Sequence, residues 1–212
     1  THVLFGPNGS GKTTLLMAIM GFPRYRVTRG RISLAGEDIT RLRPDERARK
    51  GIGIMFQRPP TVRGISLGQM VGICSRDDVD VEALAGDMNL EEFLHRDVNH
   101  GFSGGEIKRS ELLQLLAQNP RVVLLDEPES GVDMENLQLV GKAIKALLQK
   151  ELRRKRTKCG LIITHTGYIL DHVEADVGHV LCDGTIVCSG NPREQLEGIR
   201  AHGFEECATC TR

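Results

Sequence analysis

A glycine-rich run with a single lysine, GPNGSGKTT, occupies residues 6–14. A glycine, four residues, a second glycine and then Lys12 and Thr13 form a spacing typical of loops that hold a nucleoside triphosphate. Such a loop turns backbone N–H groups toward the β-phosphate; Lys12 supplies charge to the β- and γ-phosphates, and the Thr13 hydroxyl is a ligand for Mg²⁺. The alternative is an ordinary glycine-rich turn, which Lys-Thr-Thr disfavours. We expect ATP to bind Gly6, Pro7, Asn8, Gly9, Ser10, Gly11, Lys12, Thr13 and Thr14.

Two adjacent carboxylates, Asp126 and Glu127, follow an apolar run at residues 122–125. Four consecutive apolar residues are typical of a strand buried on both faces of a parallel sheet, and ligands bind beyond the carboxyl ends of such strands. We therefore expect Asp126 to hold Mg²⁺, mainly through water, and Glu127 to act as general base on an attacking water. A solvated acidic strand end is the alternative, and the phosphate loop weighs against it.

Gln57 and His165 each follow another strand-like run, residues 52–56 and 161–164. The Gln57 amide can ligate Mg²⁺ or orient water, and the His165 imidazole can hydrogen-bond the γ-phosphate and steady the water beside Glu127. The alternatives are that Gln57 is an ordinary surface residue and that His165 is a structural histidine. The expected catalytic residues are Glu127, His165 and Gln57, and the expected Mg²⁺ ligands are Thr13, Gln57 and Asp126.

A second motif, Phe-Ser-Gly-Gly-Glu at residues 102–106, has no role inside a single nucleotide pocket. Ser103 and Glu106 have the spacing of a helix capping box, which is the simpler interpretation. The two adjacent glycines indicate an anion-binding role in addition to the cap, because residues without side chains leave their backbone N–H groups open to an anion. We expect this helix start to face the γ-phosphate held by a second copy of the chain, and the loop at 130–133, whose Asp133 is also a possible N-cap, to cross between the copies. The expected contacts in trans are Ser103, Gly104, Gly105, Glu106 and Asp133.

The pattern of apolar residues predicts one α/β domain around these motifs. Strands are expected at residues 1–5, 31–34, 52–56, 122–125 and 161–164, helices at 12–20, 44–50, 103–118 and 134–154, and a hairpin at 182–185. After Pro59 and Pro60 the pattern changes, so residues 58–101 are predicted to form a small helical lobe inserted into a catalytic core of 1–57 and 102–212. The chain begins inside a strand, and we expect at least one further strand before Thr1 in the natural protein.

Composition restricts the classes of function. Lys and Arg total 28, as do Asp and Glu, so the zero formal net charge gives no general attraction to nucleic acid or to an anionic membrane. No apolar run reaches the roughly 18 residues that cross a bilayer. We also expect no signal peptide before the first motif. We therefore expect a cytoplasmic protein that is not inserted in the membrane and keeps its six cysteines reduced.

Two further features have open interpretations. The basic run at 145–158 either touches RNA or DNA or forms a solvated helix end, and we favour the solvated end, with no nucleic-acid partner. Cys207 and Cys210 form one CxxC pair, which is half of a metal site or part of a free tail, and we favour the tail.

These motifs resemble, in type and in order, those of the ATP-binding cassette (ABC) ATPases over essentially the whole chain. In that family they are the Walker A motif (6–13), the Q-loop (Gln57), the signature (103–106), the Walker B motif (122–126), the D-loop (130–133) and the H-loop (His165). The resemblance implies an ABC-type P-loop NTPase core that binds and hydrolyses ATP with Mg²⁺ as an ATP-dependent homodimer. The aromatic residue that stacks on adenine normally precedes the phosphate loop in this family and is not assigned here.

Within the ABC ATPases, the chain most resembles the SufC group, the ATPases of SUF iron–sulfur cluster assembly. The run GFSGGEIKRSE at 101–111 is similar to that group's GFSGGEKKRNEI, and LDEPESGVD at 125–133 is similar to LDExDSGLD. The resemblance implies a soluble ATPase that binds a SufB-type scaffold, or a SufB–SufD pair, through its helical lobe. Closure of two copies on ATP would then reshape that scaffold.

The chain departs from the SufC pattern in three places. The interval from Gln57 to Ser103 is short, residues 166–168 after His165 differ, and the CxxC tail is additional. The alternative function is the nucleotide-binding subunit of an ABC membrane transporter, which shares every catalytic residue. A DNA-repair or chromosome-organising ATPase is disfavoured, because the interval before Ser103 is too short for a long coiled coil.

Overall fold

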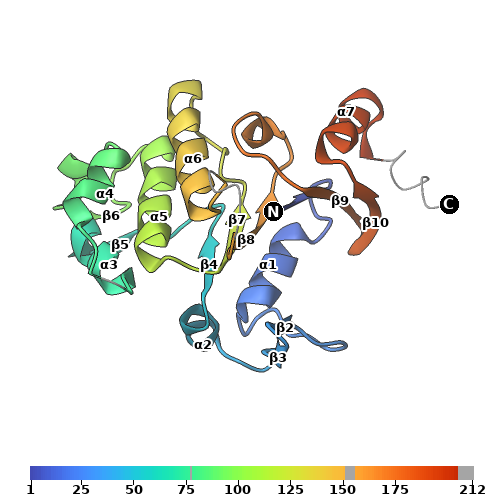
Figure 1. Cartoon of the computed structure of the whole chain (residues 1–212), viewed down its shortest axis with the longest axis horizontal. Helices are drawn as coiled ribbons and strands as arrows, with labels where there is room; N and C mark the ends of the chain where they lie inside the picture. Colours follow the sequence, from blue (N-terminus) through green and yellow to red (C-terminus); the bar gives the residue numbers. More distant parts are fainter. Residues whose placement is uncertain (77, 151–155, 205–212) are drawn as a thin grey trace.

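The computed structural model describes residues 1–76, 78–150 and 156–204, and its main feature is a six-stranded sheet in the order β10-β9-β1-β8-β7-β4 (Figure 1). Its strands are β1 (His2–Phe5), β4 (Ile52–Met55), β7 (Val122–Asp126), β8 (Cys159–Ile163), β9 (Val177–Cys182) and β10 (Thr185–Gly190). All neighbours are parallel except β9 and β10, which form the hairpin predicted around residues 182–185. The predicted α/β class is confirmed.

The parallel strands are buried on both faces because helices cover each side, as their apolar runs require. On one face Leu4 and Leu124 pack against α1 (Lys12–Met20). On the other face, Val3 and Leu125 share a core with α5 (Gly104–Gln118) and α6 (Met134–Leu147), which stand side by side in Figure 1. The strands are thereby fixed between two helical layers, and the loops at their carboxyl ends have a rigid support.

The region predicted as a helical lobe, residues 58–101, contains two α-helices and one short antiparallel strand pair that the sequence did not predict. Its elements are β5 (Val62–Ser66), α3 (Leu67–Cys74), α4 (Val81–Asp87), the 3₁₀ turn η1 (Glu91–Phe93) and β6 (Asp97–Val98). Because β6 has only two residues, no alternating pattern is long enough to reveal it. Leu67 and Val71 of α3 join the same buried core as α5. We propose that residues 58–101 form one lobe inserted into a catalytic core of 1–57 and 102–212.

The predicted helix over residues 134–154 is too long. Helix α6 ends at Leu147, and Gln149 adopts a left-handed conformation with φ 54°. Its side-chain oxygen accepts hydrogen bonds from the backbone N–H and the hydroxyl of Thr157, so the chain turns there although no glycine marks the turn. The last part of the predicted helix, residues 151–154, lies outside the described residues, as do Cys207 and Cys210.

The remaining described elements are short, apart from α7. They are β2 (Ser33–Leu34) and β3 (Glu37–Asp38), α2 (Pro44–Arg49), the 3₁₀ turn η2 (Tyr168–Asp171) and α7 (Pro192–His202). The predicted strand at 31–34 is therefore shorter than expected, and α7 was not predicted, although Asn191 caps it and Pro192 opens it. Among the described residues, no helix has both the length and the apolar character to cross a bilayer.

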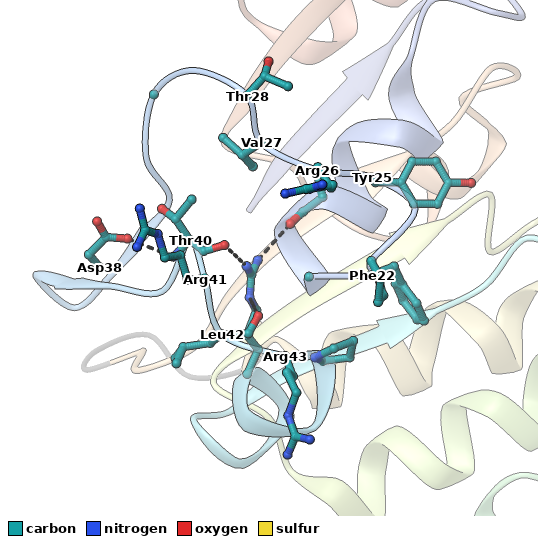
Figure 2. Close-up of a pocket in the computed structure, with 16 residues that line it drawn as sticks. Phe22, Tyr25, Arg26, Val27, Thr28, Asp38, Thr40, Arg41, Leu42 and Arg43 are labelled. Carbon is teal, nitrogen blue, oxygen red and sulfur yellow. Dashed lines mark hydrogen bonds between the residues drawn. The ribbon is translucent and has the colours of Figure 1, made fainter.

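Arg47 of α2 is 1% exposed and joins α2 to the end of α1, beside the pocket that Thr40 and Leu42 help to line (Figure 2). Its guanidinium donates to the carbonyl oxygens of Ala18 and Ile19 at 2.8 and 2.7 Å, and to those of Leu42 and Thr40 at 2.9 and 2.8 Å. The last carbonyls of a helix have no partner within it and favour a cation. Arg47 therefore fixes the far end of the helix that begins at the phosphate loop. The adjacent cavity of about 820 Å³ contains none of the predicted site residues.

We expect Arg47→Met to lower the free energy of unfolding by about 3 kcal/mol, because it leaves four buried carbonyl oxygens without their charged donor. Urea denaturation measures this, with Arg49→Met on the same helix as control, since Arg49 is exposed and its ion pair among the described residues is with Asp45 at the surface. Equal stability of the two variants would show that Arg47 does not hold the end of α1.

Candidate functional site

The predicted site residues form a row along one edge of the sheet. The strands β1, β8, β7 and β4 are neighbours in that order, and all four are parallel. The phosphate loop follows β1, His165 follows β8, Asp126 and Glu127 stand at the end of β7, and Gln57 follows β4. Because parallel strands end at the same edge, groups far apart in sequence meet beyond it.

The phosphate loop closes tightly on the neighbouring hairpin. A Cβ atom added at Gly6 would lie 2.3 Å from the carbonyl oxygen of Leu181, so only glycine fits. Gly11 has φ 102°, in the left-handed region, and serves as N-cap of α1. The N-terminus of α1 therefore opens directly on the loop, an arrangement that favours an anion.

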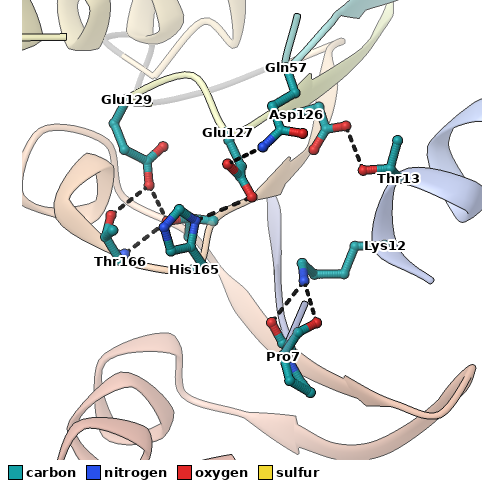
Figure 3. A network of polar contacts seen from close by, with 12 residues as sticks. Pro7, Lys12, Thr13, Gln57, Asp126, Glu127, Glu129, His165 and Thr166 are labelled. Carbon is teal, nitrogen blue, oxygen red and sulfur yellow. Dashed lines mark hydrogen bonds and ion pairs between the residues drawn. The ribbon is translucent and has the colours of Figure 1, made fainter. Parts of the chain in front are cut away.

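Lys12 lies in the curve of this loop with 6% of its surface exposed (Figure 3). Its ammonium donates to the carbonyl oxygens of Gly6 and Pro7 at 2.8 and 2.9 Å. Burial lowers the pKa of Lys12, whereas the charges of Glu127 and Asp126 raise it. An ammonium has three N–H donors. The two bonds fix its position and leave a donor for a phosphate oxygen.

Thr13 and Asp126 supply a set of oxygens that suits Mg²⁺. The Thr13 hydroxyl donates to Oδ2 of Asp126 at 2.9 Å. Oδ1 of Asp126 is buried and has no hydrogen-bond partner among the described residues. Burial raises the pKa of Asp126, the Thr13 hydrogen bond lowers it, and the neighbouring Glu127 charge raises it further. An unpartnered buried carboxylate oxygen beside a hydroxyl is a place for a hard cation, so these residues fit the expected metal.

Glu127 is the centre of the site and is held on both carboxylate oxygens. Gln57 donates from Nε2 to Oε2 at 2.7 Å, and Nδ1 of His165 lies 3.2 Å from Oε1 (Figure 3). Glu127 itself has φ 50°, a left-handed conformation uncommon for a glutamate, and its N–H donates to the carbonyl oxygen of Ile163. The structure thus brings the three predicted catalytic residues into direct contact.

The two segments predicted to act in trans lie against each other within one chain. Ser103 and Glu106 form the capping box: the Ser103 N–H donates to Glu106 at 2.6 Å, and the Glu106 N–H donates to the Ser103 hydroxyl at 3.4 Å. A Cβ atom on Gly104 would lie 2.5 Å from the carbonyl oxygen of Gly131. Gly131 belongs to the loop that ends at Asp133, the N-cap of α6. No hydrogen bond or ion pair among the described residues joins 103–106 to the phosphate loop.

Sequence reasoning missed two buried charged residues, Lys108 and Glu111, on the helix that begins at Ser103. Lys108 donates from Nζ to the carbonyl oxygens of Phe56 and Gln57 at 2.9 and 3.0 Å, and Glu111 accepts the Phe56 N–H at 3.0 Å. In a helix, residues three apart lie on one face, and a mixture of charges there suggests solvent rather than core. The pair connects α5 to the backbone of Gln57.

We expect Glu111→Gln to flatten the pH dependence of stability between pH 4.5 and 7. Burial raises the pKa of Glu111 to about 7 from an ordinary 4.5, although the Phe56 N–H and the Lys108 charge act in the opposite direction. In that window the folded chain keeps a proton that the unfolded chain releases, so the free energy of unfolding falls as pH rises. Glutamine removes this loss while keeping an acceptor for the Phe56 N–H.

Urea denaturation of both proteins from pH 5 to 8 measures the effect, with the exposed Glu197→Gln as matched control. The Glu111 variant should gain stability relative to the parent as pH rises, and the control should not. Parallel curves for parent and Glu111→Gln would contradict the buried protonation.

The sequence is similar to those of known proteins over most of its length. A family model described as "ABC transporter" matches residues 1–130. The chain is 38% identical over 207 residues to "Probable ATP-dependent transporter ycf16" of Cyanidium caldarium, with 90% of this chain and 79% of that protein covered. It is 37% identical over 218 residues to "Vegetative protein 296" of Bacillus subtilis, with 96% and 81% covered. A "Probable ABC transporter ATP-binding protein" of Streptococcus pyogenes is 39% identical over 202 residues, with 89% and 77% covered.

Two solved structures share the fold at lower identity. One is a nucleotide-free ATP-binding cassette from an ABC transporter, with a TM-score of 0.75, 23% identity, and 95% of this chain and 84% of that chain covered. The other is a bacterial Atm1-family ABC exporter with ATP bound, with a TM-score of 0.75, 22% identity, and 98% and 36% covered.

Proposed function

Because the chain belongs to the ATP-binding cassette (ABC) family of ATP hydrolases, we propose that it drives conformational change in a SufB-type or SufB–SufD scaffold during iron–sulfur cluster assembly. ABC ATPases bind ATP and work as dimers with partner subunits. The observation that carries the proposal is the run GFSGGEIKRSE at 101–111, which is similar to the SufC signature. Its Lys108 and Glu111 join the signature helix to Gln57, at the edge of the segment that would meet the scaffold.

Binding of the triphosphate is assigned to residues 6–14 and the start of α1. The loop N–H groups and Lys12 would hold the β- and γ-phosphates, as the helix start favours an anion. Thr13 and Asp126 would hold Mg²⁺, with Gln57 completing the proposed ligands. When bound, Mg²⁺ supplies positive charge that offsets the charge developing on the phosphate oxygens.

Hydrolysis is assigned to the carboxylate of Glu127. As general base it takes a proton from water while the water oxygen attacks the γ-phosphorus. Gln57 and His165 fix its two oxygens, so the carboxylate does not rotate away from the water. His165 is half-exposed and its Nδ1 contacts Glu127, so Nε2 would be the ring nitrogen that hydrogen-bonds the γ-phosphate.

The second copy is proposed to complete the pocket. Ser103, Gly104, Gly105 and Glu106 open α5 beside the loop that holds Asp133, and helix N–H groups at this tip suit an anion bound by another chain. Closure would bring this tip to the γ-phosphate, and hydrolysis would release it. Movement at Gln57 would pass to α5 through Lys108 and Glu111, and from there to residues 58–101.

The second candidate is the nucleotide-binding subunit of a membrane transporter. Two of the three relatives named above have the word transporter in their names, and the catalytic residues are common to both functions. The candidates differ in the partner, a scaffold protein in one case and a membrane-spanning protein in the other.

We expect Glu127→Gln to retain ATP binding and to lower turnover by a factor of about 100 or more, because the amide cannot accept the proton. The variant should also accumulate a dimer in ATP, measured by size-exclusion chromatography with light scattering. Glu135→Gln, an exposed glutamate at the start of α6, is the control and should behave as the parent. Normal turnover in Glu127→Gln would refute its role as general base.

The scaffold proposal is tested by purifying the tagged chain from native lysate, identifying the partner by mass spectrometry and assaying iron in the complex. We expect a β-rich scaffold protein that stimulates a slow basal ATPase. Isolation of a polytopic membrane protein, or high basal activity that no partner raises, would instead favour the transporter subunit.

A further inference from the structure

A buried carboxylate outside the predicted site, Glu129, contacts the residues on both sides of His165 (Figure 3). Its Oε1 accepts hydrogen bonds from the hydroxyls of Thr164 and Thr166, the latter at 3.0 Å. Glu129 is 7% exposed and Thr164 is fully buried. A glutamate is rarely buried to this extent unless hydrogen bonds compensate for the free energy lost when water is removed from its carboxylate.

The turn around His165 is built on these hydrogen bonds. The Thr164 hydroxyl accepts the Gly167 N–H at 2.8 Å, so its own hydrogen is directed to Glu129. Gly167 has φ 74°, and an added Cβ atom would lie 2.5 Å from a methyl carbon of Leu196. The backbone on both sides of His165 is therefore fixed by Glu129 and by a left-handed turn at Gly167 that strains any residue with a side chain.

The imidazole of His165 has little packing of its own. Its side chain is 45% exposed, whereas the Glu127 side chain that it contacts at 3.2 Å is 8% exposed. A half-exposed ring can occupy several rotamers, and the backbone sets which of them reach Glu127, because it fixes the direction of the Cα–Cβ bond. The hydrogen bonds from Thr164 and Thr166 to Glu129, which we call the clamp, hold the backbone that flanks the ring. Arg200 adds a hydrogen bond to the carbonyl oxygen of Thr166 at 3.1 Å.

We propose that Glu129 is a positioning residue, which holds His165 against Glu127 through the hydroxyls of Thr164 and Thr166. This inference rests on the proposed catalytic roles of Glu127 and His165. Glu129 also directly precedes the loop 130–133, which lies against Gly104 at the tip of α5. The same clamp thus ties the orientation of His165 to the segment that would meet a second copy.

The clamp requires an acceptor oxygen at Glu129 rather than its charge. Burial raises the pKa of Glu129, the hydrogen bond from Thr164 lowers it, and the charge of Glu127 raises it. Oε2 has no partner among the described residues. A proton on Oε2 would leave Oε1 able to accept both hydroxyls.

The test compares Thr166→Val, which keeps the shape but loses the hydroxyl, with Thr166→Ser, which keeps the hydroxyl. We expect Thr166→Val to lower kcat about 10-fold with little change in the KM for ATP, because binding is left intact while the general base loses its support. Thr166→Ser should regain most of the kcat. Thr28→Val, at an exposed threonine that is distant from Thr166 in the sequence, is the matched control.

A double-mutant cycle with His165→Ala separates positioning from a merely structural role. If Thr166 acts through His165, adding Thr166→Val to His165→Ala lowers kcat by less than about twofold. An equal 10-fold loss in both backgrounds, or a serine variant as slow as the valine variant, overturns the proposal.

Two further comparisons keep the outcomes distinct. Glu129→Gln retains the acceptor oxygen and should keep most of the kcat, whereas Glu129→Met should match Thr166→Val, with folding of each checked by thermal melting.

If His165→Ala itself leaves kcat unchanged, the proposed role of His165 fails and the clamp fails with it. If His165→Ala is slow but Thr166→Val and Glu129→Met are not, the clamp alone is wrong.

Discussion

The site depends on a single constraint, the fixed orientation of the Glu127 carboxylate. Its backbone adopts a left-handed conformation at the end of β7, and the N–H of Glu127 is bonded to the next strand. This geometry turns the side chain away from the strand and toward Gln57 and His165. A carboxylate held on both oxygens, with little exposure to water, keeps its direction without reorganisation when charge develops beside it.

The groups around Glu127 come from segments that are themselves connected. Lys108 and Glu111 bind the backbone of Phe56 and Gln57, so the signature helix and the glutamine move together. Arg47 fixes the opposite end of α1, so the loop carrying Lys12 has a stable base. These links give a physical route by which a change at the phosphates reaches the surface of the chain, since packed elements shift as units rather than deform.

The sequence predicts the site better than it predicts the elements away from the site. Gln57, Glu127 and His165 were predicted to meet because each follows a short apolar run, and such runs become adjacent parallel strands. Lys108 and Glu111 were missed because charged residues on a helix usually face water. The end of α6 was missed because Gln149 makes a left-handed turn without glycine, supported by a contact with Thr157 that no local pattern reveals. Partners distant in sequence decide such details.

The central claim is that each nucleotide pocket combines Lys12 of one copy with Ser103 of another, and mixing two inactive variants tests it most directly. Lys12→Ala and Ser103→Arg each remove one half of the pocket, and a mixed dimer contains one intact pocket and one with both defects. Equal mixing makes half of the dimers mixed, so the account predicts recovery of about a quarter of the parent ATPase rate. No recovery in such mixtures, with both variants folded and able to dimerise, would contradict a shared pocket.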